Sequence, residues 1–231
     1  MMEFPGFLRI PVADWIDSAV SWIVVNLGAV LDVIGDVLLG VLVAAERLLL
    51  WLPWFVILIA IALLAWFAIR KWWAPVMMAG FLILIGTFGY WDLAMMTLAL
   101  IFAAVVISLL IGIPTGIAMA RSDGFAGVLR PILDGMQTMP SFVYLIPALM
   151  FFGLGKVPAV FATVIYAVPP VIRLTNVGIR GVSQSVIEAA KAFGASSKQI
   201  LWEVQLPLAF PSIMVGINQT TMMALAMVVI A

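Results

Sequence analysis

Long apolar runs constrain the possible folds of this chain more than any other feature of its sequence. Six of them follow one another from residue 52 onward, and most end at charged or aromatic residues. Because backbone polar groups have no water partners inside a lipid bilayer, such runs predict membrane-spanning α-helices. We therefore predict an all-α integral membrane protein, a transmembrane helix bundle whose spans cover residues 52–69, 74–90, 93–120, 141–152, 157–172 and 208–231.

The composition supports this class and excludes several kinds of chemistry. Hydrophobic residues make up 66% of the chain and charged residues 10%, against roughly 25% charged residues in soluble domains. The sequence has no Cys, no His and a net charge of zero. Disulfides, thiol catalysis and His-based metal sites are therefore excluded, and nucleic acid is a poor partner. We expect no catalytic residue, no metal site and no cofactor bound by this chain.

The first 50 residues carry acidic residues at helical spacing. Asp14, Asp17, Asp32 and Asp36 fall on one stripe of a helix, with apolar residues opposite. Because several acids on one face disfavour a simple span, residues 1–50 are predicted to form an N-terminal amphipathic extension. It would be one helix or two, lying at the membrane surface or against the bundle formed by residues 51–231. An early transmembrane helix near residues 37–50 is the alternative.

The basic residues predict which side of the membrane each loop faces. Loops rich in Lys and Arg lie in the cytoplasm, and alternation of the six spans gathers eight of the eleven basic residues on one side. The N-terminus is then extracytoplasmic, together with Glu3, Arg9, Arg47 and Lys156. The eight predicted cytoplasmic residues are Arg70, Lys71, Arg121, Arg130, Arg173, Arg180, Lys191 and Lys198.

A polar segment, residues 173–207, interrupts the apolar sequence on the predicted cytoplasmic side. Residues 185–188 (Ser-Val-Ile-Glu) have the spacing of a capping box that starts a helix, and Gly194 suits the left-handed position that ends one. Residues 196–199 (Ser-Ser-Lys-Gln) fit a second capping box, and Pro207 is expected to break the second helix. Two short helices joined at a glycine indicate a docking surface for another protein. An amphipathic loop helix resting on lipid headgroups is the alternative.

The same segment resembles a known family motif. Its pattern is similar to the EAA motif of ABC-importer permeases, with Val in one place where that motif usually has Ile. The sequences at 133–147, 167–179 and 205–231 narrow the resemblance to permeases for glycine betaine, proline betaine and related quaternary amines. The resemblance covers residues 90–231 well and the first 50 only in general character. The matching residues are Glu188, Ala189, Ala190, Gly194, Val204, Leu206 and Pro207.

This resemblance implies a fold, a role and a set of partners. The fold is that of a type I ABC importer, and the seven matching residues would couple the chain to an ATPase. The implied partners are cytoplasmic ABC ATPase subunits that use ATP and Mg, an extracytoplasmic substrate-binding protein, and a second permease copy in a homodimer. The chain itself would be no enzyme. It would be a multi-pass protein of a bacterial inner (plasma) membrane, with further apolar sequence implied beyond Ala231. The cargo stays open among glycine betaine, proline betaine, choline, carnitine and trimethylamine N-oxide.

Two groups of residues are candidates for the translocation path. Residues 137–144 break the helical pattern where a predicted span begins, and irregular backbone at membrane depth is tolerated where it lines a cavity. Uncharged polar residues in the last predicted span face either the passage or a neighbouring helix. The candidates are Gln137, Met139, Pro140, Phe142, Tyr144, Asn218 and Thr221.

Small residues four apart occur inside the third predicted span, at Gly112 and Gly116, with Pro114 between them. Such spacing is typical of helices that approach each other closely in membranes. We predict close helix packing here, and a gating hinge is the alternative.

An ion-gradient-driven secondary transporter or channel for small solutes is the alternative function. Such proteins usually place ionisable residues within their spans. The interiors of the six predicted spans contain no Asp, Glu, Lys or Arg, which argues against proton coupling but leaves open a sodium site built from backbone carbonyls.

Overall fold

The computed structural model describes residues 12–231, and this part of the chain consists of helices without any β-strand. The predicted all-α class is therefore confirmed. Residues 1–11, which include Glu3 and Arg9, lie outside the described residues. The helices are α1 (Val12–Trp51), α2 (Trp54–Ile69), α3 (Trp73–Thr87), α4 (Trp91–Arg121), α5 (Asp123–Thr138), η2 (Ser141–Tyr144), α6 (Leu145–Phe152), α7 (Lys156–Arg180), α8 (Gln184–Ala192), α9 (Ser197–Gln199), η3 (Ile200–Gln205) and α10 (Leu206–Val228).

The predicted N-terminal extension is one helix, α1, over its described part. At 1.5 Å per residue its 40 residues span about 60 Å, roughly twice the hydrocarbon thickness of a bilayer. Its first half is almost entirely exposed, whereas Leu38 and Leu42 in its second half are buried against Ala103 of α4 and Val160 of α7. By length and composition α1 could itself cross a membrane. Its location at the membrane surface therefore stays a prediction.

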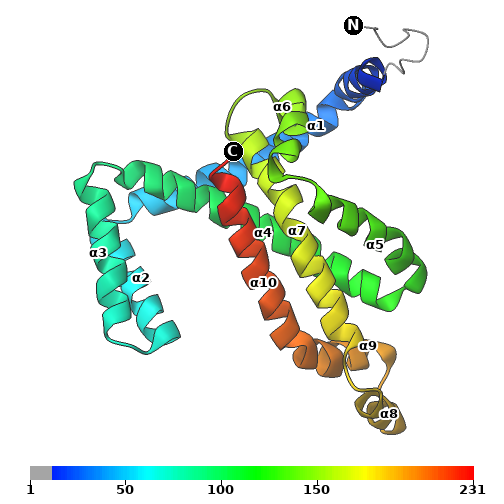
Figure 1. The fold of residues 1–231 in the computed structure, drawn as a ribbon. Coiled ribbons are helices and arrows are strands. Elements are labelled where there is room, and N and C mark those ends of the chain that lie inside the picture. Colours follow the sequence, from blue (N-terminus) through cyan, green and yellow to red (C-terminus); the bar gives the residue numbers. More distant parts are fainter. Residues whose placement is uncertain (1–11) are drawn as a thin grey trace, which may run out of the picture.

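The helices α2 and α3 form a hairpin that stands apart from the other helices (Figure 1). They occupy the predicted spans 52–69 and 74–90, with 16 and 15 residues. Each is therefore about 22–24 Å long. Arg70, at φ 53°, ends α2 and donates its backbone N–H to the carbonyl of Trp66 at 2.8 Å. Whether these two shorter helices cross the membrane stays a prediction.

The core of the bundle consists of α4, α7 and α10, which pack against one another (Figure 1). Glycines make the close approach of α4 to α7 possible. A Cβ atom on Gly112 would lie 2.3 Å from Cγ1 of Val171, and one on Gly116 would lie 2.6 Å from Cβ of Thr175. The prediction of close packing at Gly112 and Gly116 is therefore confirmed. Between α7 and α10, Ser212 donates a hydrogen bond to the backbone carbonyl of Leu174 at 2.8 Å.

A bent pair of helices completes the bundle. The helix α5 is amphipathic, with Ala126 and Leu133 buried against the residues of α4 and α7. The chain then breaks, and the helical segment Ser141–Phe152 continues at 112° to α5. The predicted break in residues 137–144 is confirmed, because Met139 and Pro140 have extended backbone between the two helices.

Candidate functional site

The predicted docking segment leaves the bundle at the end of α7 and returns through η3 into α10 (Figure 1). Its first helix, α8, packs against η3 and has no buried residue. The attachment to the bundle is made by η3, where Ile200 and Leu201 are 5% and 4% exposed. Leu201 belongs to a buried cluster with Ile179 of α7 and Ile213 of α10. Because only one side of α8 is held, the rest of its surface faces outward.

The start of α8 differs from the prediction. The helix begins at Gln184, so Ser183 with its extended backbone occupies the N-cap position. Ser185 is already helical and cannot cap, and the predicted capping box at residues 185–188 is wrong. Glu188 instead accepts a hydrogen bond from the side-chain amide of Gln184 at 3.3 Å. The hydroxyl groups of Ser183 and Ser185 lie 2.7 Å apart.

The end of α8 follows the prediction. Gly194 has φ 83°, a left-handed conformation that glycine adopts without steric cost. The N–H of Gly194 donates to the carbonyl of Lys191 at 2.9 Å, and the N–H of Ala195 donates to that of Ala190 at 3.0 Å. This pair of bonds is the Schellman arrangement. A rigid turn at Gly194 therefore fixes the direction of the next helix.

The second helix of the segment begins as predicted but does not end where predicted. Ser196 and Gln199 form both bonds of a capping box, which is confirmed. Pro207, however, does not break the helix, and residues 197–228 are continuous. The reason is the π-helical turn of η3, in which the N–H of Leu206 bonds to the carbonyl of Leu201 five residues back. Pro207 then lies in the first turn of α10, directly after this π-helical turn.

The residues of the predicted coupling motif occupy two different environments. Residues 188–190 lie on α8, which Gly194 ends. Residues 204, 206 and 207 lie where η3 joins α10. Large exposed apolar side chains accompany them: Phe193 is 93% exposed and Trp202 is 58% exposed. Both side chains are therefore accessible to a partner. The exposed motif residues are Glu188, Ala189, Gly194 and Pro207, and the half-buried ones are Ala190, Val204 and Leu206.

The predicted translocation-path residues lie at the bend between α5 and α6 and on α10. Gln137, Met139, Pro140 and Phe142 are exposed, whereas Tyr144 is half-buried. The Tyr144 hydroxyl donates to the backbone carbonyl of Met136 and so bridges the bend. That these residues line a passage stays a prediction.

On α10, Asn218 is exposed, and the half-buried Thr221 donates within its own helix to the carbonyl of Ile217 at 2.9 Å. Met136, next to the first group, and Ile217, next to the second, pack on the same buried cluster. The passage-lining role of Asn218 and Thr221 likewise stays a prediction.

Two ion pairs between α5 and α7 were missed by sequence reasoning. Arg173 lies 2.5 Å from Asp134, and Arg180 lies 2.6 Å from Asp123. The signal was available, since each pair joins opposite charges at the ends of neighbouring apolar segments in a chain with few charges. Within residues 12–231 no group of three Asp or Glu residues that could hold a metal ion is found.

Comparisons with known proteins agree with these observations. Residues 112–231 match the family model described as "Binding-protein-dependent transport system inner membrane component". The chain is 46% identical, over 222 residues, to the glycine betaine/proline betaine transport system permease protein ProW of Escherichia coli (strain K12), covering 96% of this chain and 62% of that protein.

Two further relatives carry related names. One is the glycine betaine transport system permease protein OpuAB of Bacillus subtilis (strain 168), 46% identical over 223 residues, covering 96% of this chain and 79% of that protein. The other is the trimethylamine N-oxide transport system permease protein TmoV of Ruegeria pomeroyi. It is 36% identical over 239 residues, covering 99% of this chain and 36% of that protein. The chain therefore spans less than two thirds of the E. coli and R. pomeroyi relatives.

Proposed function

Because the chain belongs to the family of binding-protein-dependent transport system inner membrane components, we propose that it is the membrane-spanning permease subunit of an ATP-driven ABC importer. Its cargo would be a quaternary amine or related compatible solute, the class named for its relatives. The family has the type I importer transmembrane fold, in agreement with the fold implied by the EAA-like residues. A permease of this family does not itself catalyse a reaction.

The proposed assembly has two copies of this chain, cytoplasmic ATPase subunits that bind ATP and Mg, and an extracytoplasmic binding protein. The proposed location is a bacterial inner membrane, with the N-terminus extracytoplasmic and the segment 181–207 in the cytoplasm. The positive-inside rule supports this orientation, since Arg180, Lys191 and Lys198 lie in or beside the segment.

The observation that carries the proposal is the exposure of α8 and its terminal glycine. The helix packs on η3 and is joined to α7 by residues 181–183, and its Schellman turn holds it in one orientation. A partner can bind such an element without disturbing the core of the bundle. A force applied to it would reach α7 and α10 through the cluster of Leu201, Ile179 and Ile213.

Gly194→Asp tests the proposal. A Cβ atom on Gly194 would meet nothing within 4 Å, so the substitution creates no clash inside this chain. Asp also tolerates left-handed backbone better than most residues. The substitution should therefore leave folding and membrane insertion intact, and its effect should come from a partner that contacts the turn. Uptake of labelled glycine betaine and ATP hydrolysis are measured with the complete complex in vesicles.

The chain offers a matched control in Gly89, at the turn between α3 and α4. Gly89 has φ 78° and also has nothing within 4 Å of an added Cβ. We expect Gly194→Asp to abolish ATP-dependent uptake and Gly89→Asp to leave it unchanged. Equal uptake by wild type and Gly194→Asp would refute the coupling role. Uptake by vesicles that lack any ATPase would instead favour an ion-gradient-driven transporter.

A further inference from the structure

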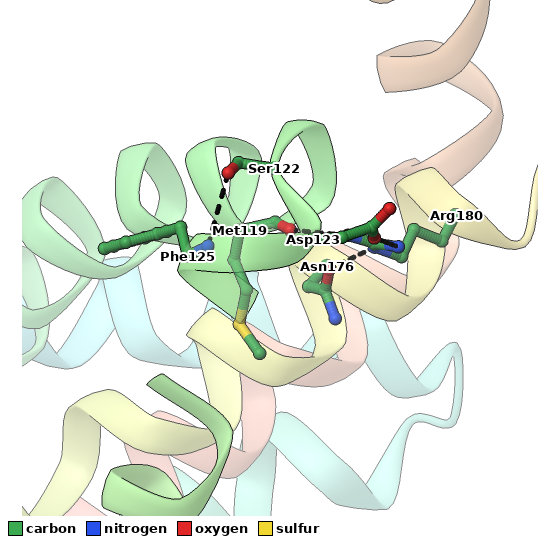
Figure 2. A network of polar contacts seen from close by, with 6 residues as sticks. All are labelled: Met119, Ser122, Asp123, Phe125, Asn176 and Arg180. Atoms are coloured by element: carbon green, nitrogen blue, oxygen red, sulfur yellow. Dashed lines mark hydrogen bonds and ion pairs between the residues drawn. The ribbon is translucent and has the colours of Figure 1, made fainter. Parts of the chain in front are cut away.

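Two corners of the chain meet where α7 ends. Arg180 is the last residue of α7, and the segment that carries α8 begins immediately after it at Gly181. Beside it, α4 ends at Arg121 and turns into α5 through Ser122, whose hydroxyl caps α5 by accepting from the N–H of Phe125 at 3.2 Å. Figure 2 shows the Arg180 side chain reaching toward this second corner.

The Arg180 guanidinium uses each of its three nitrogens for a different partner (Figure 2). Nη1 donates to the carboxylate of Asp123 at 2.6 Å, and Nη2 donates to the backbone carbonyl of Met119 at 2.9 Å. Nε donates to the side-chain carbonyl of Asn176, one turn back on α7, at 3.0 Å. Met119 belongs to the last four residues of α4, whose carbonyls have no partner within the helix. Arg180 therefore joins α7 to the end of α4 and to the start of α5.

The burial of these groups shows which bonds matter most. Asp123 is 92% exposed and Arg180 is 32% exposed, so water screens their ion pair and it contributes little. Asn176, in contrast, is 5% exposed and holds the plane of the guanidinium in place. The bond to the Met119 carbonyl requires that plane. Lys could replace the charge of Arg180 but not its planar, forked set of donors.

A second link makes α5 follow α7 along its length. Arg173, seven residues before Arg180, pairs with Asp134 near the other end of α5 at 2.5 Å. The apolar face of α5 is buried against the same helix through Leu133. Beyond Asp134 the chain enters the bend at Met139 and Pro140, which joins α5 to α6.

We propose that Arg180 is a positioning residue that transmits movement of the docking segment to α5 and to the bend that follows it. The inference rests on the proposed function, since it requires that a partner ATPase moves α8. A displacement of Gly181 would act first on Arg180. The bond to the Met119 carbonyl, made by a guanidinium that Asn176 holds in place, would carry that displacement into the corner between α4 and α5. Without Arg180, α8 would still move with the ATPase, but the start of α5 would follow it less, because only the Arg173–Asp134 pair and the buried face of α5 would remain to link α5 to α7.

Arg180→Gln and Arg180→Lys test this in the complete complex with its ATPase and binding protein. We expect both variants to hydrolyse ATP in response to the loaded binding protein but to import several-fold less substrate per ATP. Asp123→Asn should keep a ratio of imported substrate to hydrolysed ATP near that of wild type, because its ion pair is exposed. The matched control is Arg121→Gln, which replaces an exposed arginine at the same corner. A merely structural role would lower both activities together and leave their ratio unchanged.

Distances between spin labels separate this inference from the proposed function. This sequence has no Cys, so single cysteine pairs can be placed at exposed residues. The first pair of labels is placed at Lys198 and at Leu154, which lies on the loop between α6 and α7; its distance reports movement of the docking segment. The second pair is placed at Val128 and Leu154, and its distance reports movement of α5. Labelled copies are diluted with unlabelled ones so that each complex holds one pair.

Each outcome decides one point. In wild type both distances should change when ATP is trapped with vanadate. In Arg180→Gln the change at Lys198 should persist and the change at Val128 should be clearly smaller than in wild type, because the Arg173–Asp134 pair remains. If both changes keep their wild-type size in Arg180→Gln, or if its import per ATP equals that of wild type, the role of Arg180 is refuted. If neither distance changes in wild type, the proposed coupling function itself fails.

Discussion

The substitution Gly116→Ala tests the packing of α4 on α7, on which the position of the docking segment depends. An added Cβ would lie 2.6 Å from Cβ of Thr175 and 2.7 Å from the backbone oxygen of Ile172. An ordinary carbon–carbon contact is about 3.5–4 Å, so the two helices would have to separate by on the order of 1 Å. Neither obstacle can move aside cheaply, because Thr175 is fully buried and the other atom is backbone.

The magnitude follows from two opposing terms. Overpacking a well-packed site costs about 1–3 kcal/mol, whereas Ala gains roughly 0.5–1 kcal/mol over Gly in a helix interior. Gly116→Ala should therefore lower the free energy of unfolding by on the order of 1–2 kcal/mol. Gly127→Ala in α5 is the control, since nothing lies within 4 Å of its added Cβ. Only the helix-propensity gain remains there, so the control should stabilise by up to about 1 kcal/mol.

The assay is unfolding of the detergent-purified protein by heat or denaturant, with membrane insertion checked separately. The two substitutions should shift the midpoint in opposite directions. Equal stability of Gly116→Ala and wild type would contradict the close packing of α4 on α7. It would favour the alternative of a hinge at Gly112 and Gly116.

Three further predictions probe other contacts. Lys156→Gln should lower the free energy of unfolding by roughly 1–2 kcal/mol, and by more than Glu46→Gln, because Lys156 Nζ lies 2.6 Å from a Glu46 carboxylate that is only 12% exposed and would lose its partner. The reverse order in a denaturant titration would contradict this pairing of α1 with α7. Tyr144→Phe removes the bond to the Met136 carbonyl across the bend and should cost about 1 kcal/mol; an unchanged unfolding midpoint would argue against that bond. Leu201→Ala, at a site 4% exposed, should cost about 2–4 kcal/mol. The neighbouring Trp202→Ala, 58% exposed, should leave stability unchanged and weaken only ATPase binding in a pull-down; equal losses of stability would contradict the attachment through η3.

Local signals in the sequence were sufficient for much of this structure. The apolar runs predicted α2, α3, α4, α6, α7 and α10 but not α5, and Gly194 and residues 196–199 predicted a turn and a cap whose bonds lie within six residues. The capping box at residues 185–188 was predicted wrongly because Ser183 and Ser185 are equally good caps by chemistry. Only the path of the chain out of α7 decides between them.

Features that depend on distant residues could not be predicted in the same way. The π-helical turn that accommodates Pro207 occurs where Ile200 and Leu201 are buried against the bundle, and their spacing alone does not indicate it. Likewise, Arg180 and Asp123 are 57 positions apart. The sequence identifies both as charged residues beside apolar segments, but their meeting follows from the antiparallel packing of α5 on α7.

The central claim is that α8 docks on an ATPase in the cytoplasm, and a single cysteine at Ala189 tests it most directly. Ala189 is exposed and the sequence has no other cysteine. In intact cells this residue should be protected from a membrane-impermeant thiol reagent, and a short bifunctional cross-linker should join it to the ATPase subunit, with a yield that changes on ATP binding. Labelling of Ala189→Cys by the impermeant reagent from outside the cell would contradict the account.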